Sequence, residues 1–168
     1  YAVLLEDSGV EVEYTVTERA AFFRFLYPEE GSANVMTYLA GDATLEVLPD
    51  GALSGSQVFR GVRTYFHIVF SQSPEDTTVE KHDLPEGGHR RWRSIVPTIA
   101  AQSAFGTQGV SGIEVRAAIS YISADQARSN LERELPNWDF DDAVDAARAT
   151  WDDLLGRVVV EGGTEAQK

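Results

Sequence analysis

Apolar and polar residues alternate with a period of two through most of the first 122 residues, and then the alternation stops. The clearest stretch is VEVEYTVT, where Val10, Val12, Tyr14 and Val16 alternate with glutamates and threonines. Because successive side chains of a β-strand point to opposite faces, this stretch predicts an antiparallel strand with one face in the core and one in solvent.

Four further segments are predicted as strands. Ala20–Tyr27 is apolar on both faces and is expected to be a more central strand. Ala43–Phe59 predicts a hairpin that turns at Pro49-Asp50-Gly51, and Val62–Ser71 and Gly112–Ser123 are the remaining strands. Frequent turns between short strands favour a β-sandwich over βαβ units. Two polar or glycine-rich segments, 73–91 and 100–112, are interpreted as loops.

Near Ser123 the apolar period becomes helical. Ser123 and Gln126 form a capping-box pattern, and Pro136 is expected to stop the helix that follows. Its predicted apolar face comprises Ala124, Ala127, Leu131 and Leu135. Asp139 is expected to cap a second helix, whose apolar stripe comprises Phe140, Val144, Ala147, Trp151 and Leu154. The predicted fold is therefore mainly β: an antiparallel β-sandwich over residues 1–122, followed by two linker helices within residues 123–168.

Composition excludes several classes of function. Acidic residues outnumber basic ones 27 to 14, and the resulting net charge of −13 repels a phosphate backbone, so no nucleic-acid partner is expected. The absence of cysteine excludes disulfides, thiol catalysis and thiolate metal sites. No apolar run approaches the roughly 20 residues that span a bilayer, so no membrane partner is expected either.

Histidines and aspartates give no defensible metal site. His67 lies within a predicted strand and is interpreted as a hydrogen-bonded structural residue. His82 and His89 flank acidic residues at a spacing that matches no zinc pattern. The aspartates from Asp139 onward suggest calcium, but an EF-hand loop requires glycine where this chain has Val144, so helix capping explains them better. We assign no metal ligand and no catalytic residue to this chain.

The stretch GGHRRWRS is the one segment with the character of a recognition site. Trp92 is flanked by Arg91 and Arg93 in an otherwise acidic chain. An exposed indole offers a flat apolar face to a sugar ring, and arginine donates paired hydrogen bonds to hydroxyls or a carboxylate. These three residues are the candidate substrate contacts. The alternative is that Trp92 lies in the core and the arginines pair with nearby acids.

Three stretches resemble the α-mannosidases of glycoside hydrolase family 92. They are VEVEYTVTERAAFFRFLYPE, TYFHIVFSQ and the long C-terminal segment VRAAISYISADQARSNLERELPNWDFDDAVDAARATWDDLLGRVVVEGGTEAQK. The resemblance implies an N-terminal β-sandwich that is joined through helices to an (α/α)6 barrel, with the substrate site between them. It also implies a calcium-dependent, inverting enzyme that is secreted or periplasmic and acts on mannose-containing glycans.

In that family the catalytic carboxylates and calcium ligands belong to the barrel, which would begin shortly after Lys168. A further family segment would precede Tyr1, so we expect an N-terminally truncated sandwich that needs no cofactor of its own and is inactive alone. Its expected partners are its own barrel and the glycan. Two alternatives remain: a free-standing carbohydrate-binding module, or a purely structural interaction domain. Exposure of the stripe from Phe140 to Trp151 would indicate a missing partner domain.

Overall fold

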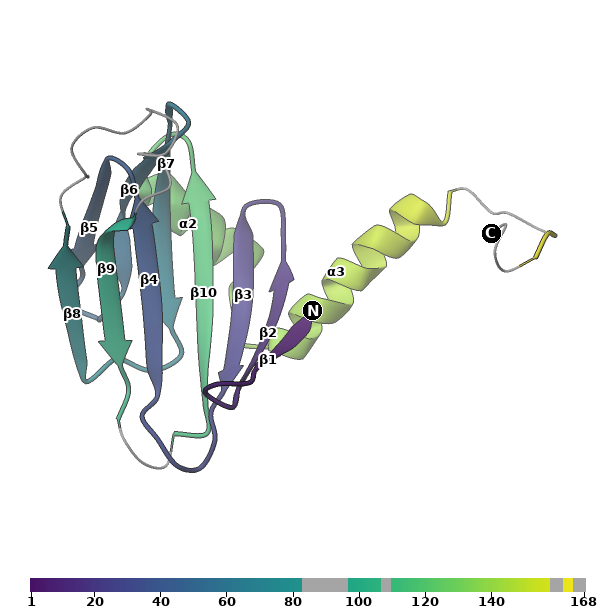
Figure 1. Ribbon diagram of the computed structural model, residues 1–168. Coiled ribbons are helices and arrows are strands. Elements are labelled where there is room, and N and C mark those ends of the chain that lie inside the picture. The colour runs from purple at the N-terminus through teal and green to yellow at the C-terminus, as the bar shows by residue number, and fades with distance from the viewer. Residues whose placement is uncertain (83–96, 107–109, 158–161, 165–168) are drawn as a thin grey trace.

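The computed structural model describes residues 1–82, 97–106, 110–157 and 162–164 (Figure 1). In this part of the chain the strands form two antiparallel sheets, and two helices cover the outer face of the larger one. The large sheet comprises, in pairing order, β1 (Ala2–Leu5), β2 (Val10–Val16), β3 (Ala20–Leu26), β10 (Gly112–Ser120), β7 (Val62–Phe70), β6 (Leu53–Phe59) and β5 (Ala43–Val47). The small sheet comprises β4 (Asn34–Ala40), β9 (Pro97–Ala104) and β8 (Asp76–Lys81).

The predicted hairpin is present as β5 and β6. Its turn contains Gly51, whose φ of 84° is a conformation that L side chains rarely adopt. The backbone N–H of Gly51 donates to the Leu48 carbonyl at 2.9 Å, and Leu48 N–H donates to Ala52 at 2.8 Å. Glycine is therefore required at the position where the sequence predicted it.

A hydrophobic core fills the space between the two sheets. Leu53 and Ile113 of the large sheet and Ala101 of the small one have no exposed surface. Around them pack side chains from both layers, including Val35, Leu39, Phe66, Ile99, Phe105 and Val115. Inter-sheet burial of this kind defines a β-sandwich, so the predicted fold class is confirmed.

The second core lies between the large sheet and the helices α2 (Ala124–Glu134) and α3 (Phe140–Leu155). Phe22 of the strand predicted to be central is fully buried there and meets the Phe140 ring edge-on, 5.3 Å away. Ala127, Leu131 and Leu135 of the predicted α2 face are buried as expected. The remaining members of this core are Ala20, Ala118 and Phe140, with Val69, Ala143 and Val144 partly buried against them.

Both predicted helix caps are present, with one difference. Ser123 accepts from the backbone of Gln126 at 3.1 Å, and Asp139 accepts from the backbone of Asp142 at 2.9 Å. The reciprocal half of the capping box is wrong, because the Gln126 side chain donates instead to Asn130 at 3.1 Å. Asn130 is buried and fixed by other bonds, so it competes successfully for that amide.

The small sheet is the main feature that the sequence interpretation missed. β8 lies within the segment interpreted as a polar loop, and β9 ends within the segment interpreted as a glycine-rich loop. β8 has the sequence DTTVEK and is an edge strand of the small sheet. Only alternate side chains point inward, so most of its residues are polar and the strand resembles a loop in sequence. β9 has the sequence PTIAAQSA, in which most side chains are small. It therefore lacks the alternation of large apolar and polar residues by which a typical strand is recognised.

One expectation about β2 is only half met. Val10 and Val12 are half-buried, whereas 37% of Tyr14 and 51% of Val16 are exposed. The alternation is as predicted, but the small sheet does not extend over this end of the large sheet (Figure 1). The apolar face of β2 therefore lacks a cover in the described part of the chain.

Candidate functional site

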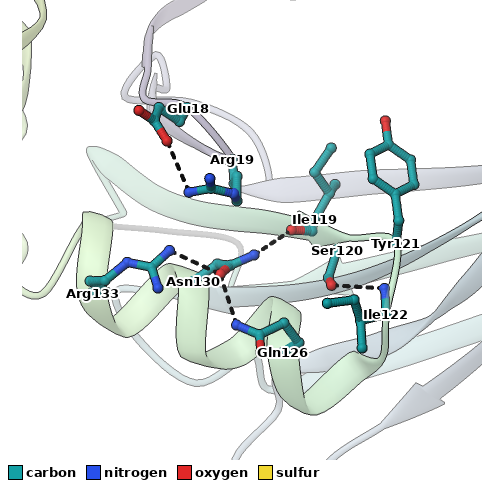
Figure 2. Close-up of a pocket in the computed structure, with 9 residues that line it drawn as sticks. All are labelled: Glu18, Arg19, Ile119, Ser120, Tyr121, Ile122, Gln126, Asn130 and Arg133. Atoms are coloured by element: carbon teal, nitrogen blue, oxygen red, sulfur yellow. Dashed lines mark hydrogen bonds and ion pairs between the residues drawn. The ribbon is translucent and has the colours of Figure 1, made fainter.

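A pocket of about 540 Å³ lies where the large sheet meets α2 (Figure 2). Three segments build it: the turn between β2 and β3, the end of β10 with the connection that follows, and one face of α2. They contribute Glu18 and Arg19, then Ile119, Ser120, Tyr121 and Ile122, and then Gln126, Asn130 and Arg133.

Asn130 organises the helical side of this pocket. Its amide nitrogen donates to the Ile119 carbonyl at 2.9 Å, and its side-chain oxygen accepts from Gln126 and Arg133, each at 3.1 Å (Figure 2). Asn130 is only 3% exposed. A buried, multiply bonded amide is costly to displace, so it holds both neighbouring polar side chains at the pocket in one arrangement.

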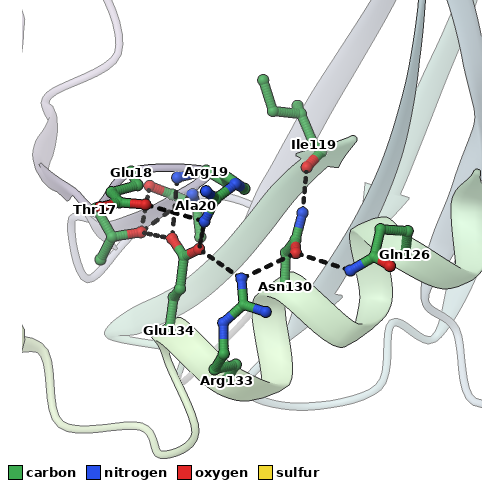
Figure 3. A network of polar contacts seen from close by, with 9 residues as sticks. All are labelled: Thr17, Glu18, Arg19, Ala20, Ile119, Gln126, Asn130, Arg133 and Glu134. Carbon is green, nitrogen blue, oxygen red and sulfur yellow. Dashed lines mark hydrogen bonds and ion pairs between the residues drawn. The ribbon is translucent and has the colours of Figure 1, made fainter. Parts of the chain in front are cut away.

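Glu134 fixes the turn on the other side (Figure 3). Its carboxylate accepts from the Thr17 hydroxyl at 2.7 Å, from the Arg19 backbone at 2.9 Å and from the Arg19 guanidinium at 2.9 Å. Arg133 adds a contact at 3.1 Å. Burial alone would raise the pKa of Glu134, but these hydrogen bonds outweigh it and lower the pKa to about 2.

The side chains that line the pocket are suited to binding a ligand rather than to catalysing a reaction. Tyr121 and Ile122 are 68% and 76% exposed and give one end of the pocket an apolar surface with an aromatic ring, whereas Arg19 and Arg133 line the pocket towards its other end (Figure 2). A concave surface with an exposed ring and fixed planar donors suits a polyhydroxylated ligand. Glu134 is a permanent acceptor near neutral pH and is unsuited to act as a general acid there.

A second charged cluster holds α3 against the sheet. Arg24 donates to Glu13 at 2.7 Å and to Asp141 at 3.3 Å, and its guanidinium lies 4.3 Å from the centre of the Phe140 ring. The hydrogen bond to Glu13 raises the pKa of Arg24, whereas burial raises the pKa of nearby Glu114. Since Arg24 binds the second residue of α3 and covers the first, we interpret this cluster as structural.

Within the described part of the chain, the residues that were considered as metal ligands have other roles. Asp139 caps α3, and Asp141 pairs with Arg24. In the described ranges no group of three or more histidine or acidic side chains could hold an ion.

His67 is buried as expected, and burial lowers its pKa, but the expected hydrogen bond to its ring is not found among the described residues. His82 lies 3.7 Å from Glu80, and His89 is outside the described residues.

Trp92, Arg91 and Arg93, the substrate contacts predicted from sequence, also lie outside the described residues. The pocket residues were not predicted. Tyr121 and Ile122 follow the last strand in sequence and read as its continuation, whereas β10 ends at Ser120 and leaves both exposed. Arg19, the last residue of the β2–β3 turn, carried no signal that distinguished it from a surface charge.

An apolar groove of about 450 Å³ runs along α3. One wall is the α3 surface around Ala143, Ala147 and Trp151, and the other is formed by Val16 and the segment between the helices. Phe140 is buried at the start of α3, but Trp151 is 60% exposed and Leu155 is 67% exposed near its end. α3 thus extends away from the two sheets (Figure 1). Its apolar stripe leaves the core after Val144. None of the described helices is long and apolar enough to cross a membrane.

Two family models match consecutive parts of the chain. The model described as the glycosyl hydrolase family 92 N-terminal domain matches residues 1–120, and the model of the family 92 catalytic domain matches residues 126–168. An uncharacterized secreted glycosidase of Arthroderma benhamiae is 24% identical over 194 residues, covering 97% of this chain and 25% of that protein.

Solved structures show the same fold. A family GH92 inverting mannosidase of Bacteroides thetaiotaomicron superposes with a TM-score of 0.81 at 23% identity, covering 98% of this chain and 23% of that one. A family GH92 α-mannosidase of the same organism gives 0.79 at 26% identity, covering 97% of this chain and 24% of that one. The chain spans about a quarter of the length of these relatives.

Proposed function

This chain belongs to glycosyl hydrolase family 92, and we propose that it is the N-terminal, non-catalytic part of an exo-α-mannosidase. In this proposal the sandwich forms one wall of the active site and a scaffold for an (α/α)6 barrel supplied by the rest of the polypeptide. The mannosidases that share its fold support the substrate class. The match of residues 126–168 to the catalytic-domain model supports α2 and α3 as the linker that leads to the catalytic part.

The observation that carries the proposal is the exposed half of α3. A helix that packs entirely on its own sandwich would bury its apolar stripe, yet Trp151, Leu154 and Leu155 are 60%, 47% and 67% exposed. Apolar patches of this kind mark interaction surfaces. The barrel is the expected partner because the same helix matches the catalytic-domain model.

Sugar contacts are proposed at two places. One is the pocket beside Tyr121, Arg19 and Arg133, and the other is Trp92 with Arg91 and Arg93. We assign no calcium site to the described residues, since their acidic groups do not fit one; the calcium implied by the family resemblance would be held by the barrel. Secretion or periplasmic location is proposed on the strength of the secreted relative.

Replacing Tyr121 with alanine is expected to raise the KM of the complete enzyme for an α-mannoside by about 5- to 10-fold with little change in kcat. One sugar–ring contact contributes about 1 kcal/mol, and no catalytic role is assigned to this ring. Steady-state kinetics measures the effect, with Tyr38→Ala, a comparably exposed tyrosine on the small sheet, as the control. Equal KM values for both variants and the unaltered enzyme would exclude the pocket as a sugar site.

The proposal is tested by hydrolysis of an aryl α-mannoside, with calcium and with a chelator. Three samples are compared: residues 1–168, the polypeptide that follows Lys168, and their mixture. We expect activity only in the mixture. Activity of residues 1–168 alone would contradict a non-catalytic role. If the mixture has no activity but residues 1–168 bind a mannoside in calorimetry, the carbohydrate-binding module would be favoured.

A further inference from the structure

Arg116 of β10 holds the short connection between α2 and α3 in place. Its guanidinium donates to the backbone carbonyls of Leu135 and Asn137, the second of them at 3.2 Å. Leu135 is the residue at which α2 ends, and α3 begins at Phe140, so both bonds act where the chain changes direction. The positive charge also lies at the C-terminal end of α2, where the helix dipole favours a cation.

A row of stacked side chains continues this contact to the start of α3. The Arg116 guanidinium lies 3.8 Å from the centre of the Trp138 ring. The Trp138 and Phe22 rings meet edge-on with their centres 5.9 Å apart, and Phe22 meets Phe140 in the same way at 5.3 Å. The guanidinium of Arg24, on the strand that pairs with β10, lies 4.3 Å from the centre of the Phe140 ring. Two cations from adjacent strands thus enclose three rings, two of which belong to the connection and to the first turn of α3.

The burial of Arg116 makes its hold on the connection rigid. Burial lowers the pKa of Arg116, and the charge of nearby Glu114 opposes that shift only in part. Its Nε is buried and has no hydrogen-bond partner among the described residues. The two carbonyls and the Trp138 ring are therefore the main groups that compensate the charge. A movement of the connection away from β10 would leave a half-buried cation without them, which is strongly unfavourable.

The far part of α3 has no comparable support from the sandwich. α3 comprises 16 residues, but the core beneath it ends near Val144, and Trp151 and Leu155 are exposed. The helix extends away from both sheets (Figure 1). At 1.5 Å per residue it is about 24 Å long, so a rotation of about 10° at its start would move its end by about 4 Å. The direction of α3 is therefore set by the contacts at its beginning.

We propose that Arg116 is a positioning residue, which fixes the direction in which α3 leaves the sandwich and thereby places the sandwich against the catalytic part. This inference rests on the proposed function, in which the sandwich forms one wall of the active site and the two helices lead to the catalytic part. A misplacement of about 1 Å at an active site costs about 100-fold in rate, so a helix end that moved by several ångström would disrupt such a site. Arg116 touches no substrate in this proposal and acts only through the connection.

The first test measures the distance between two spin labels on residues 1–168. The chain has no cysteine, so cysteines introduced at two exposed positions, Glu46 of β5 and Ala149 of α3, are the only sites of attachment. We expect Arg116→Met to widen the distribution of label-to-label distances at least about two-fold, because methionine fills the space without donors or charge. Arg116→Lys should restore part of the narrow distribution, since its ammonium keeps the charge beside the ring.

Two further variants separate this effect from a general loss of structure. Trp138→Leu removes the ring from the same contact and should widen the distribution similarly, and the double variant with Arg116→Met should add little. Arg128→Met is the matched control: Arg128 is 63% exposed on α2 and pairs with Glu132, so the distribution should not change. Thermal unfolding shows which variants are folded, and Trp138→Leu carries the test if Arg116→Met is not. An unchanged distribution in the folded variant would overturn the proposal.

Steady-state kinetics of the complete enzyme tests the consequence for catalysis. Arg116→Met should lower kcat for an aryl α-mannoside at least about 10-fold, Arg116→Lys should recover part of the loss, and Arg128→Met should have no effect. A widened distance distribution with an unaltered kcat would overturn the positioning role. Absence of mannosidase activity in the unaltered enzyme would instead contradict the proposed function. The two failures are distinguishable because the label distances are measured without substrate.

Discussion

Replacing Trp151 with glutamate should leave the sandwich folded but lower the mannosidase activity recovered on mixing it with the catalytic part by at least about 100-fold. Trp151 is 60% exposed, and the core beneath α3 ends near Val144, so the substitution removes little packing within this chain. It does place a charge in the middle of the apolar stripe that the barrel is proposed to cover. An unpaired charge buried in an interface costs several kcal/mol, which corresponds to the expected loss.

Ala149→Glu is the matched control for this experiment. It introduces the same charge on α3 two residues away, and at about 100° per residue it lies on the opposite side of the helix. We expect near-normal recovery of activity with this variant. Thermal unfolding of both variants of residues 1–168 checks that the sandwich is intact. Full recovery with Trp151→Glu would show that α3 does not contact the barrel through this stripe.

The elements that could be predicted from the sequence are those whose residue pattern occurs in only one kind of secondary structure. β3 and the two helices combine a long apolar pattern with a cap or a defined end, and they lie where they were predicted. The small sheet lacks such a signal. β8 is a charged edge strand and β9 is built from small residues, so their strand character comes from pairing with each other and with β4.

The candidate site was harder to predict because it depends on contacts between distant residues. Glu134 meets Thr17 across 117 residues of sequence, and Asn130 reaches the end of β10 only after α2 has folded back on the sheet. The apolar period of a segment indicates which of its residues share one face of a helix or strand. It does not indicate which distant segment of the chain that face will contact. Tyr121 is a further example, since it became a pocket residue only because β10 ends one residue earlier.

Replacing Glu134 with alanine is expected to lower the free energy of unfolding of residues 1–168 by about 2–3 kcal/mol. The carboxylate is 11% exposed and joins the C-terminal end of α2 to the β2–β3 turn through Thr17 and Arg19. Its loss leaves the Thr17 hydroxyl and the Arg19 backbone N–H without that acceptor, and each unsatisfied group costs about 1 kcal/mol or more. Chemical denaturation at pH 7 measures the change.

Glu132→Ala is the control, because Glu132 lies on the same helix, is 64% exposed and pairs with Arg128 one turn away. An exposed pair of this kind contributes less than about 0.5 kcal/mol. If both variants lost the same stability, the effect of Glu134→Ala would reflect a general change in α2, and the proposed clamp between helix and turn would be wrong.

The same clamp should make stability depend on pH in the acid range. The folded pKa of Glu134 is about 2, below its ordinary value of 4.5, so the folded state favours the ionised carboxylate. Its contribution is therefore complete above about pH 5 and is lost as the pH falls from there towards 2. The unaltered chain should lose more stability than Glu134→Ala over that interval, since the variant has no such group to protonate. Parallel stability curves for the two proteins between pH 5 and pH 2 would show that the carboxylate is not held in its ionised form by Thr17, Arg19 and Arg133.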